Sequence, residues 1–232
     1  MSDLDDQATG GQTASEWHET APGLEWREGG VPVSTRFDDP YFSLAGGLEE
    51  TGHVFLAGND VPARLRPGFH VAELGFGTGL NLLALARVAT VPVRFTSFEA
   101  FPMSEAQMAQ AHAAFPAMSE LAAQLREGWP GRRMRVGLIE AEIIVGDVRD
   151  TLSAWDGCAD AWFLDGFSPA KNPEMWSDAL MAEVGRHTPR GGTFATYTAA
   201  GHVRRALAAA GFAVERRPGF AGKRHMSAGL MT

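Results

Sequence analysis

The chain has 232 residues, 45% hydrophobic and 21% charged, which is enough for one globular domain with a substantial core. Its single cysteine, Cys158, excludes an internal disulfide and a cysteine-rich metal site, so we expect no metal. No run approaches the roughly 18 apolar residues of a membrane span, and the acidic N-terminus lacks a signal peptide pattern. We therefore expect a cytoplasmic protein without a membrane partner.

The net charge of −8 argues at first against a nucleic-acid partner, because phosphate binding needs local positive charge. The charge is unevenly distributed, however. Residues 1–60 carry 12 acidic and 2 basic side chains, a balance of −10, whereas residues 201–232 carry 6 basic and 1 acidic, a balance of +5. A basic face is compatible with this pattern, and the alternative is a set of ordinary surface and helix-end arginines.

Residues 1–22 are rich in Asp, Thr, Ser, Gly and Gln and have little to bury, which predicts a disordered acidic tail. Residues 23–232 are expected to form one domain, beginning with a short hairpin around the turn 28–30. From residue 69 onward, strand and helix patterns alternate. Strands are predicted over 70–74, 93–99, 142–145, 161–164, 193–198, 212–215 and 225–231. Helices are predicted over 81–89, 104–125 with a break near Pro116, 148–155, 173–187 and 201–210.

This alternation is typical of the α/β class, with a mostly parallel sheet covered by helices on both faces. Seven strands are expected. The last two, 212–215 and 225–231, are joined through Pro218-Gly219 without a helix between them, so they should pair antiparallel. The arrangement predicts a Rossmann-like sheet with an antiparallel C-terminal strand.

The strongest local motif is a strand that runs into the glycine loop Gly75-Phe76-Gly77-Thr78-Gly79 and then into a helix. Such a loop brings backbone N–H groups close to a ligand at the carboxyl end of the strand. Its spacing is G-x-G-x-G, not the G-x-G-x-x-G of dinucleotide-binding proteins. Glu73, two positions before the first glycine, resembles the first motif of S-adenosylmethionine methyltransferases, in which the carboxylate faces the amino-acid moiety of the cofactor. The alternative is a plain tight turn.

Two further carboxylates follow the next two predicted strands. Glu99 lies 20 residues past Gly79, where a carboxylate can accept hydrogen bonds from both hydroxyls of a ribose. Asp147 resembles the methyltransferase residue that accepts a hydrogen bond from the adenine amino group. A strand-end surface Glu is the alternative for Glu99, and a helix N-cap is the alternative for Asp147.

The last motif, Asp165-Gly166-Phe167-Ser168-Pro169, ends the apolar strand 161–164. Amino methyltransferases place an Asp or Asn and an aromatic residue there to orient the acceptor nitrogen. Asp165 is therefore the candidate catalytic residue, which would orient an amine and take its proton. The alternative is a structural Asp that caps the amides of the following turn.

Together with these motifs, longer runs of the chain resemble a known family, the methyltransferase domain of the bifunctional tRNA 5-methylaminomethyl-2-thiouridine biosynthesis protein. The match extends from about residue 24 to the C-terminus and implies the class I methyltransferase fold. The runs that carry it are FDDPYFS (37–43), GLEETGHVFLAGN (47–59), ELGFGTGLN (73–81), FLDGFSPAKNPEMW (163–176) and GGTFATYTAAGHVRRAL (191–207).

The resemblance implies N-methylation of 5-aminomethyl-(2-thio)uridine at the wobble position of tRNA, with S-adenosylmethionine as the cofactor. The bifunctional protein also carries a C-terminal flavin oxidase domain. This chain ends at Thr232 without room for one, so we expect the stand-alone methyltransferase or that domain alone. A separate flavin-dependent oxidase is then a candidate partner acting upstream. The implied cofactor site consists of Glu73, Gly75, Gly77, Gly79, Asn81, Glu99, Asp147 and Val148.

For the tRNA substrate, Phe167 and Trp176 are candidates for stacking on the flipped uracil, and core packing is the alternative for each. Basic side chains are candidates for phosphate contacts. These are Lys171, Arg204, Arg205, Lys223 and Arg224.

Three other functions compete with this hypothesis. An amino methyltransferase could act on a different RNA base or on a small molecule. A nicotinamide-dependent oxidoreductase shares the fold but is disfavoured by the spacing of the glycines. A non-catalytic nucleic-acid-binding module is disfavoured because four motifs follow successive strands in the right order.

Overall fold

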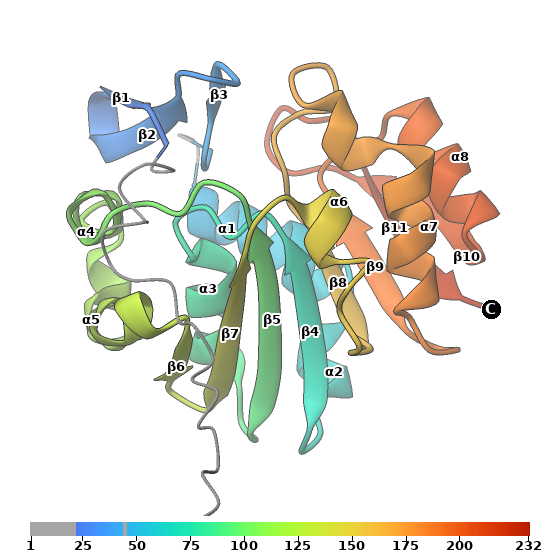
Figure 1. Ribbon diagram of the computed structural model, residues 1–232, viewed down its shortest axis with the longest axis horizontal. Coiled ribbons are helices and arrows are strands. Elements are labelled where there is room, and N and C mark those ends of the chain that lie inside the picture. The colour runs from blue at the N-terminus through green and yellow to red at the C-terminus, as the bar shows by residue number, and fades with distance from the viewer. Residues whose placement is uncertain (1–21, 44–45) are drawn as a thin grey trace, which may run out of the picture.

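The computed structural model describes residues 22–43 and 46–232, so the predicted disordered tail, apart from residue 22, lies outside the described residues. Within them, eight strands form one large sheet in the order β10-β11-β9-β8-β4-β5-β7-β6 (Figure 1). The strands are β4 (Phe69–Leu74), β5 (Val93–Glu99), β6 (Arg133–Val136), β7 (Ile139–Val145), β8 (Ala161–Leu164), β9 (Thr193–Thr196), β10 (Phe212–Pro218) and β11 (His225–Met231).

The five central strands, from β9 to β7, are parallel, as predicted. β11 runs antiparallel to both β9 and β10, which confirms the predicted antiparallel C-terminal pair. The sheet has one strand more than expected, because β6 adds an antiparallel edge next to β7. All five parallel strands end at the same edge of the sheet, and the loops that follow them meet there (Figure 1).

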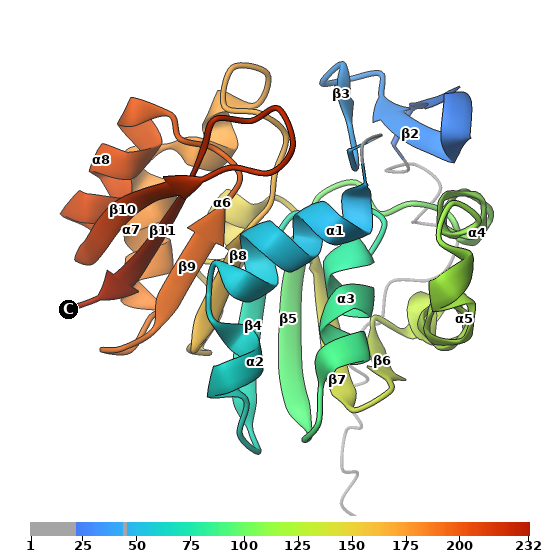
Figure 2. The same cartoon turned by 180° about the vertical axis from the view of Figure 1, so that it is seen from behind.

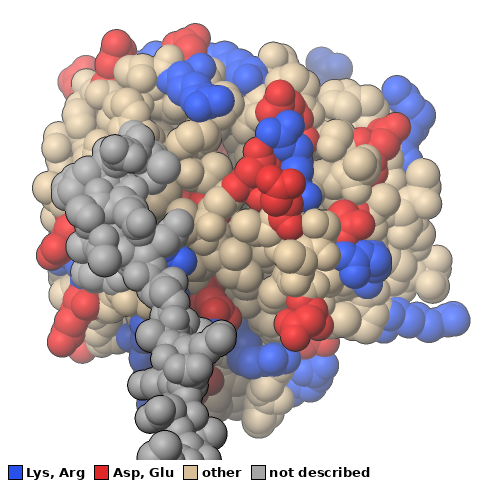
Figure 3. Space-filling model, in the orientation of Figure 1, with Lys and Arg blue, Asp and Glu red and all other residues tan. Residues whose placement is uncertain are grey.

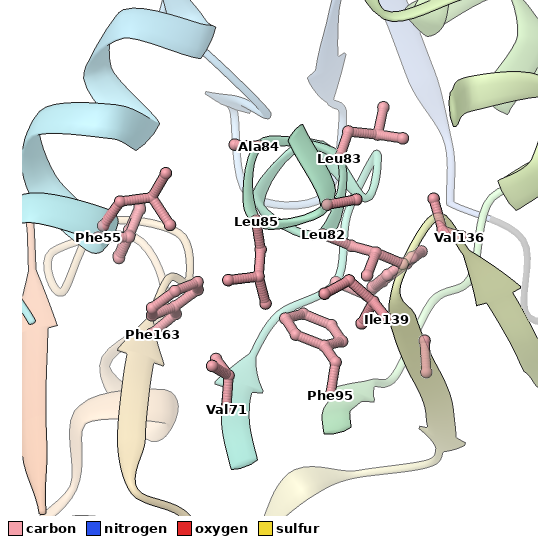
Figure 4. Close-up of a cluster of buried hydrophobic side chains, with 14 of the residues drawn as sticks. Phe55, Val71, Leu82, Leu83, Ala84, Leu85, Phe95, Val136, Ile139 and Phe163 are labelled. Atoms are coloured by element: carbon pink, nitrogen blue, oxygen red, sulfur yellow. The ribbon is translucent and has the colours of Figure 1, made fainter. Parts of the chain in front are cut away.

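Helices cover both faces of the sheet, because successive strand residues point to opposite sides. In β4, Val71 belongs to the core under α3 (Leu80–Val88), whereas Ala72 and Leu74 belong to a second core on the other face. Figure 4 shows Leu85 of α3 facing Val71, Phe95 and Phe163. The second core is closed by α6 (Val148–Thr151), α7 (Asp178–Arg186) and α8 (Gly201–Ala209).

The predicted helix 104–125 is broken at the expected place. α4 (Glu105–His112) starts with a capping box in which Ser104 and Gln107 exchange hydrogen bonds. The 3₁₀ helix η3 (Pro116–Met118) follows, and α5 (Ser119–Gly128) then continues the chain to η4 (Trp129–Gly131). The break fits proline, which has no N–H to donate inside a helix.

The predicted N-terminal hairpin is present as β1 (Leu24–Arg27), η1 (Glu28–Gly30) and β2 (Val31–Ser34). A two-residue strand, β3 (Asp39–Pro40), extends it to a small sheet of three strands. Figures 1 and 2 show this sheet beyond the carboxyl ends of β4 and β5. We call residues 24–43 the N-terminal extension.

Between this extension and β4 the chain forms three short helical segments that the sequence did not predict. They are α1 (Gly47–Thr51), the π-helix η2 (Gly52–Ala57) and α2 (Val61–Arg64). Seen from behind in Figure 2, α1 and the helix η2 that continues it cross the face of the sheet next to α3. Among the described residues, no helix is long and apolar enough to span a membrane.

Candidate active site

A cavity of about 530 Å³ lies at the carboxyl edge of the parallel strands, where the N-terminal extension meets the large sheet. It is lined by the loops that follow β4, β5, β7 and β8. The chain order reverses here, since β4 lies between β5 and β8. In open α/β sheets such a reversal is the usual place for a ligand.

The glycine loop forms one wall of this cavity through Gly75 and Gly77. Gly75 has a φ of 86°, and a Cβ there would lie 2.2 Å from the carbonyl oxygen of Asp165, so no larger residue fits. Gly77 donates its N–H to Glu99 Oε2 at 2.9 Å. Gly79 does not line the cavity, because it faces Phe76 and Leu125 in the core. The loop therefore presents two of the three predicted glycines to a ligand.

Glu99 ends β5 and is only 9% exposed, with its carboxylate on the cavity wall. Its oxygens accept from the N–H groups of Gly77 at 2.9 Å and Phe101 at 2.8 Å. Burial raises the pKa of Glu99, and the backbone N–H groups around it oppose this effect. A carboxylate has about four acceptor positions, so further hydrogen bonds to a ligand remain available.

Asp147 and Val148 also line the cavity. Asp147 is the N-cap of α6 and accepts from the N–H of Arg149 at 2.9 Å, as the alternative interpretation expected. The guanidinium of Arg149 binds the same carboxylate and lowers the pKa of Asp147. Both roles are compatible, because the residue caps the helix from the wall of the cavity.

Asp165 also lines the cavity and comes directly after β8. Its N–H donates to the carbonyl of Leu74, which places it next to the glycine loop. Its Oδ2 accepts from Asn81 Nδ2 at 2.7 Å. Burial raises the pKa of Asp165 to about 7, while Asn81 and the cation of Lys223 oppose that shift. The carboxyl group thus changes charge near neutral pH.

Glu73, a predicted cofactor residue, does not lie on the wall of the cavity. Its side chain is completely buried and does not line the cavity. Its Oε1 accepts from Asn81 Nδ2 at 2.8 Å, and its Oε2 accepts from Ser97 Oγ at 2.6 Å. Asn81, which lines the cavity, lies between Glu73 and the cavity, so a direct contact of Glu73 with the cofactor stays a prediction.

The aromatic wall of the cavity combines Phe167 with side chains from the N-terminal extension. The rings of Phe37 and Phe167 are stacked, with centroids 4.8 Å apart, and Tyr41 meets Phe167 edge-on at 5.0 Å. Trp176 is 2% exposed, belongs to the core and donates from its indole nitrogen to the carbonyl of Phe167. These contacts favour the core-packing alternative for Trp176, whose ring packs under the loop after β8.

Of the five predicted phosphate contacts, only Lys223 lines the cavity. Its ammonium lies 2.6 Å from Glu50 and 4.6 Å from the centroid of the Tyr197 ring. Lys171 instead ties the loop after β8 to the extension through Asp38 and Asp39. Arg204, Arg205 and Arg224 lie outside the cavity, on α8 and on the turn before β11.

Residues 115–232, about half of the chain, match the family described as S-adenosyl-L-methionine-dependent methyltransferase. The chain belongs to this family. The methyltransferase is therefore an enzyme with S-adenosylmethionine as its cofactor, and the alternatives of a nicotinamide-dependent oxidoreductase and of a non-catalytic module are wrong.

Two curated relatives carry the name tRNA 5-methylaminomethyl-2-thiouridine biosynthesis bifunctional protein. The one from Caulobacter sp. strain K31 is 46% identical over 225 residues, and the one from Aliivibrio fischeri is 42% identical over 235 residues. The alignments cover 88% and 90% of the methyltransferase but 37% and 35% of these relatives. The chain thus spans little more than a third of their length.

Solved structures show the same fold. A crystal structure of MNMC2 from Aquifex aeolicus has a TM-score of 0.74 and 23% identity, over 94% of this chain and 75% of that one. The precorrin-6y C5,15-methyltransferase from Geobacter metallireducens has a TM-score of 0.54 and 11% identity, over 89% of this chain and 98% of that one.

Several residues of the site were not found from the sequence of the methyltransferase. Arg36, Phe37 and Tyr41 reach the cavity from the N-terminal extension, and Thr51 and Tyr197 reach it from α1 and from the end of β9. The run 37–43 was conspicuous, but nothing in its pattern says that it contacts residue 167. Within the described ranges, no group of three or more His, Cys, Asp or Glu side chains is placed to hold a metal ion.

Proposed function

We propose that the methyltransferase transfers a methyl group to the amine of 5-aminomethyl-(2-thio)uridine at the wobble position of tRNA. The observation that carries the proposal is Asp165, a carboxyl group on the cavity wall that ionises near neutral pH. The names of relatives that are 42% and 46% identical support the substrate.

The residues around the glycine loop fit the cofactor. The spare acceptor positions of Glu99 suit the two hydroxyls of a ribose, and Asp147 and Val148 suit the amino group and the face of an adenine. Gly75 and Gly77 leave room for a ligand close to the backbone. When bound, S-adenosylmethionine supplies an electrophilic methyl group on a sulfonium sulfur.

Asp165 prepares the acceptor amine. A primary alkylamine is largely protonated at neutral pH, so it must lose a proton before its lone pair can form the new C–N bond. In its charged form, Asp165 attracts the ammonium, orients the nitrogen and accepts its proton, which frees the lone pair of the amine. Bound S-adenosylmethionine would supply the methyl group, with its sulfur as the leaving group. The raised pKa of Asp165, about 7, suits this exchange because the group takes up and releases a proton near the working pH.

The aromatic wall suits a base taken out of the anticodon stack. Phe167 and Phe37 offer ring faces at the same cavity, and unstacked RNA bases commonly bind to such faces. Lys223 lies at the cavity. With Lys171, Arg204, Arg205 and Arg224, which lie outside the cavity, it is a proposed source of positive charge for the phosphates.

The amine must be supplied by a reaction that exposes a primary aminomethyl group on the uridine. The relatives are named as bifunctional proteins, so a second activity, a flavin-dependent oxidase, is the proposed upstream partner. Because tRNA is the proposed substrate, the cytoplasm is the proposed location.

The test is methyl transfer from labelled S-adenosylmethionine to tRNA that carries 5-aminomethyluridine, followed by nucleoside analysis. We expect label in 5-methylaminomethyluridine and none in tRNA that lacks the aminomethyl group. Equal labelling of both tRNAs would show a different acceptor base. Labelling of small amines with no labelling of either tRNA would show a small-molecule methyltransferase.

A further inference from the structure

The side chain of Asn81 lies at the cavity and is hydrogen-bonded to two carboxyl groups, those of Glu73 and Asp165. It lies in the first turn of α3 and is 4% exposed. Its Nδ2 donates to Glu73 Oε1 at 2.8 Å and to Asp165 Oδ2 at 2.7 Å. Both hydrogens of one amide group are therefore used, one for each carboxyl group.

The orientation of this amide is fixed from the other side. Thr51 Oγ1 donates to Asn81 Oδ1 at 2.9 Å, so the nitrogen faces the carboxyl groups and the oxygen faces α1. Ser97 Oγ of β5 holds the far oxygen of Glu73 at 2.6 Å. Thr51, Ser97 and Glu73 are all buried, so these hydrogen bonds form where the local dielectric is low.

Of the two carboxyl groups in this network, only that of Asp165 reaches the cavity. Glu73 is fully buried, whereas Asp165 lines the cavity and is partly exposed. Without Asn81, the Oδ2 of Asp165 would have no amide donor, and the carboxyl group could rotate away from the glycine loop. An N–H donor also favours the charged form of a carboxyl group over the neutral form.

We propose that Asn81 is a positioning residue for the transfer, which holds Asp165 charged and aimed into the cavity, with Glu73 and Thr51 holding Asn81 in turn. This inference rests on the proposed function only in that Asp165 meets the acceptor amine. The family motif has a carboxylate facing the cofactor at the position of Glu73. In this proposal, Glu73 instead supports Asn81.

Asn81 also influences the protonation of Asp165. The charged groups that face Asp165 are Glu50 of α1 and Lys223 of the turn before β11, and Glu73 and Tyr197 are coupled to it as well. The N–H of Asn81 lowers the pKa of Asp165 against the effect of burial. Replacing Asn81 by Leu keeps the volume and removes the donor, so the pKa of Asp165 should rise.

The test measures this titration directly, by ¹³C NMR of the Asp carboxyl groups in the whole chain, with the Asp165 signal assigned from Asp165→Asn. We expect a midpoint near 7 in the wild type and a midpoint roughly one pH unit higher in Asn81→Leu. The acid limb of the kcat profile for tRNA methylation should move upward by the same amount, with a roughly fivefold loss at pH 7.

Asn59→Leu is the matched control. Asn59 is also buried and also makes two hydrogen bonds from Nδ2, to the carbonyls of Phe55 and Trp162, but it does not line the cavity. We expect it to lower stability without moving the Asp165 midpoint. Asn81→Ala provides a second variant if Asn81→Leu does not fold.

An unchanged Asp165 midpoint in folded Asn81 variants would overturn the proposal. The NMR titration needs no substrate, so it gives its answer even if the wild type fails to methylate tRNA. That failure would overturn the proposed function alone.

Discussion

Two carboxyl groups, those of Glu73 and Asp165, lie on either side of the amide group of Asn81, and their surroundings give them different roles. Burial raises the pKa of both. Glu73 has no exposed surface, and no cation among the described residues influences its pKa, so its neutral form is favoured strongly. Asp165 faces the cavity and is balanced by Asn81 and Lys223, so it ionises near neutral pH and is the one available for chemistry.

The buried Glu73 makes stability depend on pH. Its pKa is raised well above the ordinary 4.5 in the folded state, so the folded chain holds a proton that the unfolded chain releases above that pH. Its contribution is present below pH 4.5 and is lost as the pH rises toward the folded pKa. Glu73→Gln cannot ionise, and it can still accept from Asn81 and donate to Ser97.

We therefore expect Glu73→Gln to gain stability over the wild type as the pH rises, by up to about 1.4 kcal/mol per pH unit within that window. Urea unfolding of both proteins at pH 4.5, 6 and 8 measures the difference. A difference in unfolding free energy that stays constant with pH would show that Glu73 titrates normally in the folded chain.

At the scale of residues, the sequence was informative where side chains follow strands. Glu99, Asp147 and Asp165 come together because parallel strands end at one edge, which alternation of strands and helices already predicts. The sequence was not informative about whether a side chain points toward the cavity or into the core. Glu73 and Trp176 follow the same patterns as cavity residues, but the packing of α3 and of the core turns them away.

At the scale of elements, the N-terminal extension completes the cavity. Asp39 Oδ2 accepts from the N–H of Ser168 at 2.8 Å, and Lys171 binds Asp38, so the extension is fastened to the loop after β8. The same interactions bring Phe37 onto the face of Phe167. The extension thus supplies part of the surface on which a base can bind.

We expect Phe37→Ala to raise the KM for tRNA roughly five- to hundredfold, because stacking of a base on an aromatic ring contributes about 1–3 kcal/mol. The Kd for S-adenosylmethionine should change little. Phe212→Leu, which alters a ring pair with Phe194 outside the cavity, is the control. An unchanged KM for Phe37→Ala would remove the extension from substrate binding.

The strands that were predicted well are mostly buried along their length. The bounds of β5, β8 and β11 agree residue for residue with the predictions. The missed strand β6 has four residues with exposed and buried positions in alternation, and it lies at an edge where little burial marks it. Residues 47–64 were missed because glycines interrupt the helical pattern, and Gly58 is required where a Cβ would lie 2.0 Å from the carbonyl oxygen of Val54.

At the scale of the whole molecule, the net charge of −8 has to be reconciled with the binding of tRNA. On the face seen in Figure 3, acidic and basic side chains are interspersed. Positive charge gathers instead in the C-terminal part of the sequence, on α8 and on the turn before β11, beside the strands that border the cavity. A local basic surface is enough to attract phosphates at short range.

Reversing Arg204 and Arg205 to Glu should weaken tRNA binding and flatten its salt dependence, by about one unit of slope for each phosphate that is no longer neutralised. Fluorescence anisotropy across a series of salt concentrations measures this. Arg133 and Arg135 of β6, at the far edge of the sheet, offer a control with the same change of net charge. An equal effect of both double variants would place the tRNA surface elsewhere.

The central claim is that Asp165 prepares an amine of tRNA for methyl transfer, and single-turnover methylation by Asp165→Asn tests it most directly. Asn keeps the shape but loses the charge that attracts an ammonium and accepts its proton. We predict a rate lower by roughly 10²–10⁴-fold, with the Kd for S-adenosylmethionine nearly unchanged. In the wild type, the rate should rise with pH through about 7, where the pKa of Asp165 lies. Methylation by Asp165→Asn at close to the wild-type rate would contradict the claim and leave Asp165 a structural role only.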